Sequence, residues 1–105
     1  MDTRFQYVKL DRSENLEEFT RKKLEKLETK YDWLISAEVH FKKHEPEEPK
    51  GYICNISLSG PGPIVFAESN EESYEAAAVE TIKDLDRQLS KRKTQINSYR
   101  FLYAF

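Results

Sequence analysis

The sequence is poor in the features that cross-link a chain or place it in a membrane. Cys54 is the single cysteine among 105 residues, which excludes a disulfide scaffold and a cysteine-based zinc site. No apolar run approaches the length of about 18 residues that a membrane span requires. The first residues, Met1-Asp2-Thr3-Arg4, lack the apolar core of a signal peptide. We therefore expect a soluble, reduced, cytoplasmic protein that does not associate with membranes.

Motifs of catalysis and ligand binding are also missing. The chain has no GxGxxG segment, P-loop, HExxH or GxSxG motif, and no nucleophile–base pair stands out. His40 and Cys54 could approach each other across paired strands, with His44 in a nearby loop. This is a weak pattern for a metal site, and structural roles are the expected ones. We expect no enzyme, no metal, no cofactor and no small-molecule substrate.

The composition is that of one small folded domain. A mass of 12.4 kDa with 38% hydrophobic and 12% aromatic residues supplies a single modest core. Aromatic and β-branched residues predict a strand over 4–10, and alternating apolar residues predict strands over 35–42 and 52–58. A fourth strand over 64–68 follows the turn at 60–63. Ile35, Ala37, Val39 and Phe41 are the clearest example of the alternation.

Two helices complete the expected order β-α-β-β-β-α. The first runs over 14–30, with Ser13 as its N-cap, and carries apolar residues at helical spacing. The second follows a capping box formed by Ser69 and Glu72 and ends near Arg92. Since each helix has one apolar side, the fold class is α+β, a four-stranded sheet with both helices packed on one face. The other face would carry the mixed set Ile53, Asn55, Ser57, Ile64 and Phe66.

Charge is segregated along a nearly neutral chain. The formal net charge is −2 and the pI is about 5.7. Windows 21–30 and 83–93 together hold ten basic and four acidic residues, whereas the rest of the chain holds seven basic and fifteen acidic residues. This sorting indicates a local cationic surface that the overall charge conceals.

The basic residues form rows on both helices. The first predicted helix has a row spaced i, i+4, i+8 at Lys22, Lys26 and Lys30, with Lys23 beside it. The second helix repeats this spacing at Lys83, Arg87 and Lys91, and Arg92 and Lys93 extend the row. Cations near helix C-termini also complement the helix dipole, so a purely structural role remains open. However, dipole effects fade within one turn, and each row covers about two turns. Two such rows on adjacent helices would form one surface suited to a polyanion. Arg21 lies instead among acids, where we expect helix-internal ion pairs.

Three segments, in order, resemble the ribosome hibernation promoting factor family, also called ribosome-associated inhibitor A or protein Y. They are Lys23-Leu24-Glu25-Lys26-Leu27-Glu28, Ile35-Ser36-Ala37-Glu38-Val39, and Asp84-Leu85-Asp86-Arg87-Gln88-Leu89 with Lys91-Arg92-Lys93 after it. The likeness covers about residues 4–93. The resemblance implies a non-enzymatic cytoplasmic factor that binds the small ribosomal subunit between head and body, overlaps the mRNA and tRNA sites, and silences translation in stationary phase or stress.

The resemblance also implies which surface faces ribosomal RNA. Carried onto this sequence, it comprises Lys22, Lys23, Lys26, Arg87, Lys91, Arg92 and Lys93; helical spacing adds Lys30 and Lys83 to this rRNA-binding set. The chain resembles the short type of the family, which lacks a C-terminal dimerisation domain. We expect residues 1–93 to form the ribosome-binding domain.

Residues 94–105 would then form an aromatic C-terminal tail, separate from the domain over 1–93. Tyr99, Phe101, Tyr103 and Phe105 alternate with period two. The pattern favours a strand docked on the chain's own sheet, strand addition to a protein partner or a second copy through residues 98–105, or stacking on RNA bases. An alternative function follows from the tail, the exposed sheet face and the net acidic charge, namely a protein-binding regulatory module.

Overall fold

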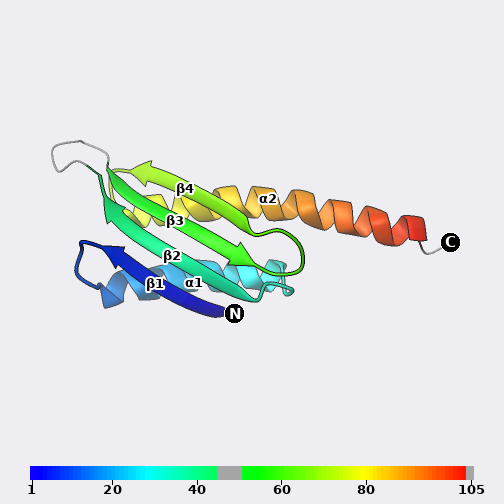
Figure 1. Ribbon diagram of the computed structural model, residues 1–105, viewed down its shortest axis with the longest axis horizontal. Coiled ribbons are helices and arrows are strands. Elements are labelled where there is room, and N and C mark those ends of the chain that lie inside the picture. Colours follow the sequence, from blue (N-terminus) through cyan, green and yellow to red (C-terminus); the bar gives the residue numbers. More distant parts are fainter. Residues whose placement is uncertain (45–50, 104–105) are drawn as a thin grey trace.

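Four strands and two helices make up the computed structural model, which describes residues 1–44 and 51–103, with side chains as far as Arg92. The elements are β1 (Asp2–Val8), α1 (Glu14–Lys30), β2 (Ser36–Lys43), β3 (Tyr52–Ser59), β4 (Val65–Glu71) and α2 (Tyr74–Tyr103). The predicted order β-α-β-β-β-α is confirmed. Figure 1 shows both helices behind the sheet, which confirms that they cover the same face.

The strands lie in the order β1-β2-β3-β4. β1 pairs with β2 in parallel, and the other two pairings are antiparallel. A parallel pair needs a long crossover, and α1 provides it. α2 contacts β3, β4 and α1, so the helices lie side by side and run in the same direction (Figure 1).

The core lies between the sheet and the helices. Val39, Phe41, Cys54 and Ile56 from the sheet are completely buried, which confirms the predicted alternation on β2 and β3. Leu24, Leu27, Leu85 and Leu89 meet them from the helices; all are at most 3% exposed. Ile35 does not follow the predicted alternation, because it precedes β2 and is 64% exposed.

The outer face of the sheet is mixed in polarity. Phe66 is 50% exposed and Ile64 is 67% exposed, as the pattern predicted, whereas Ile53 is buried. His40 pairs with Asn55, and its neighbour Phe41 pairs with Cys54. Because successive side chains point to opposite faces, His40 and Cys54 lie on opposite sides of the sheet and cannot share a metal ion.

α1 has the predicted bounds. The side chain of Ser13 accepts a hydrogen bond from the backbone N–H of Leu16 at 3.2 Å, which satisfies one of the free donors at the helix start. The C-terminal end is also as predicted, at Lys30. These local signals were sufficient because no strand competes for the same residues.

The predicted start of α2 is wrong. Ser69 and Glu71 belong to β4, where they pair with Cys54 and Tyr52 of β3. The helix begins at Tyr74, and the cap is Ser73, whose hydroxyl accepts from the N–H of Ala76 at 3.1 Å. Sheet pairing therefore outweighs the local capping pattern at Ser69.

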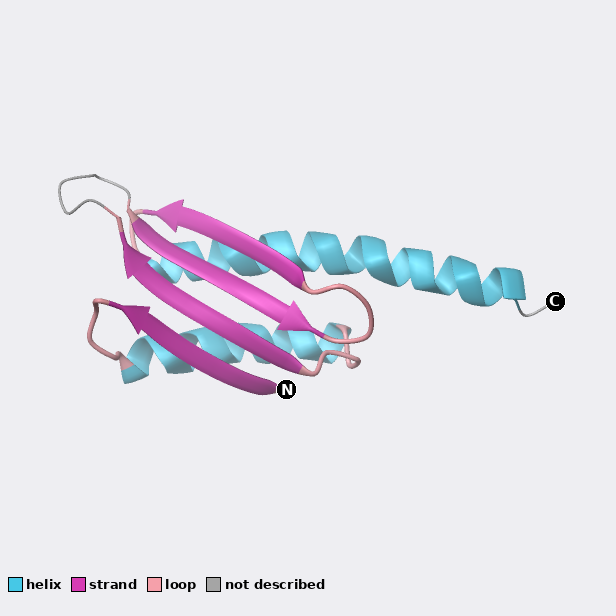
Figure 2. Cartoon of the chain, in the orientation of Figure 1, coloured by secondary structure: helices cyan, strands magenta, loops and turns pink. Residues whose placement is uncertain are grey.

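The predicted end of α2 is also wrong. The helix continues past Arg92 to Tyr103, and Figure 2 shows it as one rod that projects beyond the sheet. At about 1.5 Å per residue, the added eleven residues lengthen it by about 16 Å. A strand over 98–103 is thereby contradicted, since this segment is helical. The side chains of 93–105 lie outside the described part of the chain, so the stacking and self-association readings of the tail stay predictions.

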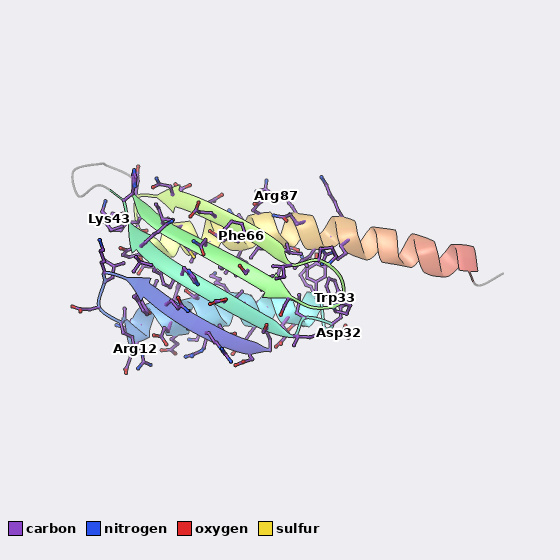
Figure 3. The ribbon with its side chains drawn as sticks, viewed as in Figure 1. Arg12, Asp32, Trp33, Lys43, Phe66 and Arg87 are labelled. Carbon is purple, nitrogen blue, oxygen red and sulfur yellow. The ribbon has the colours of Figure 1, made fainter. Side chains whose placement is uncertain are left out.

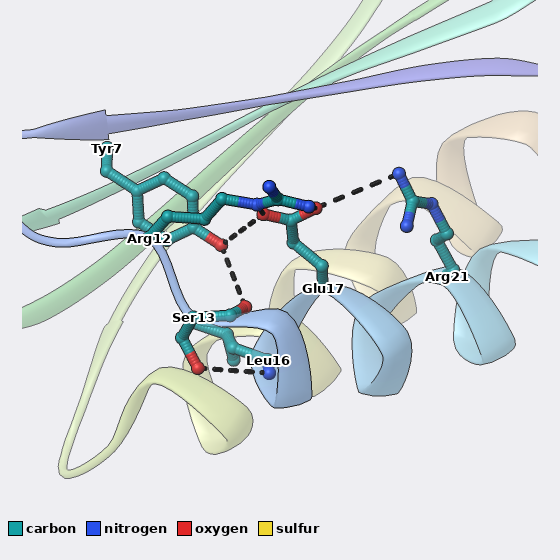
Figure 4. A network of polar contacts seen from close by, with 6 residues as sticks. All are labelled: Tyr7, Arg12, Ser13, Leu16, Glu17 and Arg21. Atoms are coloured by element: carbon teal, nitrogen blue, oxygen red, sulfur yellow. Dashed lines mark hydrogen bonds and ion pairs between the residues drawn. The ribbon is translucent and has the colours of Figure 1, made fainter.

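A buried carboxylate fixes the start of α1 against β1 (Figure 4). Glu17 is 4% exposed and accepts from Arg12 Nε at 2.8 Å and from the Tyr7 hydroxyl at 3.1 Å. Arg21 lies 3.8 Å away, which confirms the expected ion pair. The hydrogen bond from Arg12, with further help from Tyr7, holds the pKa of Glu17 below its usual value. Glu17 is therefore a structural residue as well as a first-turn acid.

Candidate nucleic-acid interface

The cationic row of α1 lies on the side of that helix that faces α2. On the opposite flank, the guanidinium of Arg21 sits over the Phe5 ring of β1 at 5.0 Å. On the near flank, Lys30 reaches Asp86 of α2. Since Lys22, Lys23 and Lys26 share this near side and the outer surface of the helix, the row borders the groove between the helices.

The two predicted rows meet around Lys30. A shallow hollow between the helices is lined by Lys30, Glu80, Lys83, Asp86, Arg87 and Ser90. Arg87 lies on the solvent side of α2 near the outer edge of the body (Figure 3). A second hollow on α1 is lined by Phe19, Lys22, Lys23, Glu25, Lys26 and Thr29. The structure thus brings Lys30 of the first window together with Lys83 and Arg87 of the second in one hollow.

Three of the predicted cations have carboxylate partners. Lys22 lies 3.4 Å from Glu18 and Lys83 lies 3.5 Å from Glu80. These pairs are exposed, and such pairs are worth little against competing contacts. The third cation, Lys30, pairs with Asp86 of α2. Local ion pairs therefore leave Lys22 and Lys83 available to an incoming phosphate.

Five predicted cations have no carboxylate within ion-pair distance among the described residues. They are Lys23, Lys26, Arg87, Lys91 and Arg92. The ammonium of Lys23 lies 5.6 Å from the centre of the Phe19 ring. The side chain of Lys93 lies outside the described part of the chain. None of the five has to give up an ion pair with a described carboxylate before it meets a phosphate. Lys26, Arg87 and Lys91 are exposed, Lys23 and Arg92 are half-buried, and together they form the core of the candidate interface.

Lys30 clamps the two helices together. Its ammonium bonds Asp86 at 2.7 and 3.0 Å, and the hydroxyl of buried Tyr31 donates to the same carboxylate at 2.6 Å. The hydrogen bond from Lys30, followed by that from Tyr31, lowers the pKa of Asp86. Asp86 in turn raises the pKa of Lys30. This clamp spans 56 positions of sequence, and the spacing rules that selected Lys30 could not reveal it.

We expect Asp86→Asn to weaken the clamp and strengthen phosphate binding. A carboxyl with a lowered pKa stabilises the fold above its ordinary value of 3.8, and this stability is lost as the pH falls through the folded pKa. The wild type should therefore lose more stability between about pH 5 and pH 2 than the variant does. Freed Lys30 should raise affinity for structured RNA by about two- to fivefold. Urea titrations across this pH range and RNA binding at low salt measure both effects; an unchanged acid profile would contradict the role of the clamp.

The described residues give no support for metal binding or thiol chemistry. No group of three His, Cys, Asp or Glu side chains within them could hold a metal ion. Cys54 is buried, and burial raises the pKa of its thiol to about 12, so a reactive thiolate does not form at neutral pH. Neither described helix is sufficiently long and apolar to cross a membrane.

Comparison with known proteins decides the family. The sequence profile described as Sigma 54 modulation protein / S30EA ribosomal protein matches residues 3–97. The chain belongs to this family. The predicted resemblance is thereby confirmed, and the family's description names no enzyme. A comparison with curated protein sequences finds no significant match.

Solved structures agree with the family in fold. A ribosomal subunit interface protein from Coxiella burnetii superposes with a TM-score of 0.80 at 23% identity, over 90% of this chain and 99% of that chain. The N-terminal domain of Protein Y from Thermus thermophilus gives 0.72 at 20% identity, over 87% of this chain and 98% of that chain. At such identities the likeness establishes the shared architecture.

Proposed function

We propose that this protein binds the small ribosomal subunit through the helical face and blocks translation by occupying the channel used by mRNA and tRNA. The observation that carries the proposal is the group of five cations on α1 and α2 that have no carboxylate partner within the described part of the chain. Family membership supports the ribosome as the target, and the structural neighbours include a ribosomal subunit interface protein. The site of action would be cytoplasmic, under stress or in stationary phase.

The mechanism is steric exclusion. Contacts from lysine and arginine to phosphates give affinity and orientation without reading base sequence. Folded RNA is recognised largely by shape, so a preformed body with a fixed cationic face suits a channel walled by ribosomal RNA. This mechanism makes and breaks no covalent bond.

Salt dependence tests the electrostatic part of this proposal. If the five unpaired cations each neutralise one phosphate, log affinity should fall against log salt with a slope of roughly −4. Binding to small subunits should then weaken about a hundredfold or more between about 50 and 200 mM monovalent salt. Sucrose-gradient co-sedimentation at several salt concentrations gives the slope. A slope near zero would rule out binding through phosphates.

A protein-binding regulatory module is the second candidate. Its support is the outer face of the sheet, where Phe66 and Ile64 are half-exposed or more, and the mention of sigma 54 modulation in the family description. A pulldown with ribonuclease-treated extract separates the two candidates. Retention of a defined partner without RNA, and its loss in Phe66→Ser, would favour this reading over ribosome binding.

A further inference from the structure

An aromatic ring, that of Phe19, lies at the N-terminal end of the cationic row on α1. Phe19 is partly buried and packs against the core, so one side of its ring is anchored. Phe19 also lines the hollow on α1, together with three lysines, Glu25 and Thr29. An aromatic ring among three lysines is unusual for the outer surface of a helix, where polar residues normally prevail.

The lysines are placed around the ring by helix geometry. Lys22 and Lys23 follow Phe19 by three and four residues, and Lys26 follows by seven, so all three share its side of the helix. Side chains on a helix lean towards its N-terminus, which brings the Lys23 ammonium over the Phe19 ring at 5.6 Å. This contact is a cation–π interaction at an exposed position, and such contacts are weak.

We propose that the Phe19 hollow binds an unpaired nucleotide, with the base stacked on the Phe19 ring and the flanking phosphates held by Lys22, Lys23 and Lys26. The inference rests on the proposed function and deepens it, because it adds a contact to bases beside the contacts to phosphates. Any base can stack on an aromatic ring, so the contact selects unpaired over paired RNA and does not select sequence. When a base takes its place on the ring, Lys23 becomes available to the adjacent phosphate.

Two RNA probes of equal charge separate stacking from electrostatics. One is an oligoadenylate of about ten nucleotides, within the range that single-strand binding sites cover. The other is an abasic ribose-phosphate chain of the same length. The wild type should prefer the oligoadenylate by about fivefold or more in fluorescence anisotropy at low salt. Equal affinity for both probes, or binding of neither, would overturn the inference.

Matched variants locate the preference at Phe19. In Phe19→Leu the preference should disappear while affinity for the abasic chain is kept, because the lysines are untouched. Phe19→Tyr keeps the ring and should keep the preference. Phe66→Leu removes an aromatic ring that is 50% exposed on the opposite face, and it should behave as the wild type. A preference that survives in Phe19→Leu would overturn the inference.

A direct readout and an independent outcome complete the test. RNA that carries 2-aminopurine should lose fluorescence on binding the wild type, because stacking quenches it, and should keep it with Phe19→Leu. Unchanged fluorescence with the wild type would contradict stacking. If the wild type shows no preference for the oligoadenylate over the abasic chain, but Phe19→Leu still co-sediments with small subunits, only the stacking inference fails. If no ribosome binding occurs in the wild type, the proposed function fails as well.

Discussion

Replacing Lys23, Lys26, Arg87 and Lys91 by glutamate should abolish co-sedimentation with small ribosomal subunits. These four cations have no carboxylate partner among the described residues, so the change removes available phosphate contacts and adds four repelling charges. We expect affinity to fall by about a hundredfold to a thousandfold at low salt. Because the four positions are surface positions on well-packed helices, the unfolding midpoint should change little.

A matched control keeps the total charge change and alters its place. Glutamate at Arg4, Lys9, Lys42 and Lys43 makes the same change outside the two helices, on β1, on β2 and in the turn after β1. This control should still co-sediment, with a modest loss from the altered net charge. If the helical variant binds as well as the wild type, the helical face is not the binding surface. If both variants lose the same affinity, net charge alone accounts for the interaction.

Phe41→Ala should lower the free energy of unfolding more than the surface substitutions described above. Phe41 is completely buried, and its ring stacks on Tyr7 at 5.6 Å and meets Tyr74 edge-on at 5.7 Å. It therefore joins β1, β2 and the start of α2. Removal of a buried phenylalanine costs about 3–5 kcal/mol, a large part of the roughly 5–15 kcal/mol that holds a domain together.

The measurement is urea unfolding followed by circular dichroism. Phe66→Ala is the matched control: its ring is 50% exposed, and we expect a change of about 0.5 kcal/mol or less. Phe41→Leu should lie between the two. A smaller loss of stability for Phe41→Ala than for Phe66→Ala would show that the packing of Phe41 against Tyr7 and Tyr74 does not stabilise the fold. Below its melting temperature, Phe41→Ala should still bind ribosomes, because the cationic face is unchanged.

Much of the fold could be predicted because its signals are local. The bounds of α1 followed from Ser13 and the apolar spacing, and the alternation on β2 and β3 gave their buried faces. The start of α2 could not be predicted this way. Ser69 and Ser73 both satisfy the local rules for a cap, and only the pairing of β4 with β3 decides between them.

The candidate site was predictable in position and less so in its chemistry. Helical spacing selected both cationic rows, yet it could not distinguish Lys30, which Asp86 holds from the other helix, from Lys26, which has no such partner in the described part of the chain. Helical spacing places Phe19 on the same side of α1 as three lysines, but only the structure shows that these side chains line one hollow. Local sequence patterns do not predict contacts between segments that are far apart in the chain.

The parallel pairing of β1 with β2 has a consequence for the order of events during synthesis. Asp2 pairs with Ser36, so β1, which leaves the ribosome before β2, does not have this partner until the whole of α1 and the start of β2 have followed. At about 5–20 residues per second, this delay lasts a few seconds. Until then, Phe5 and Tyr7 lack the Phe41 ring on which they stack in the finished sheet. The pace of translation therefore sets how long this nascent segment is open to wrong contacts.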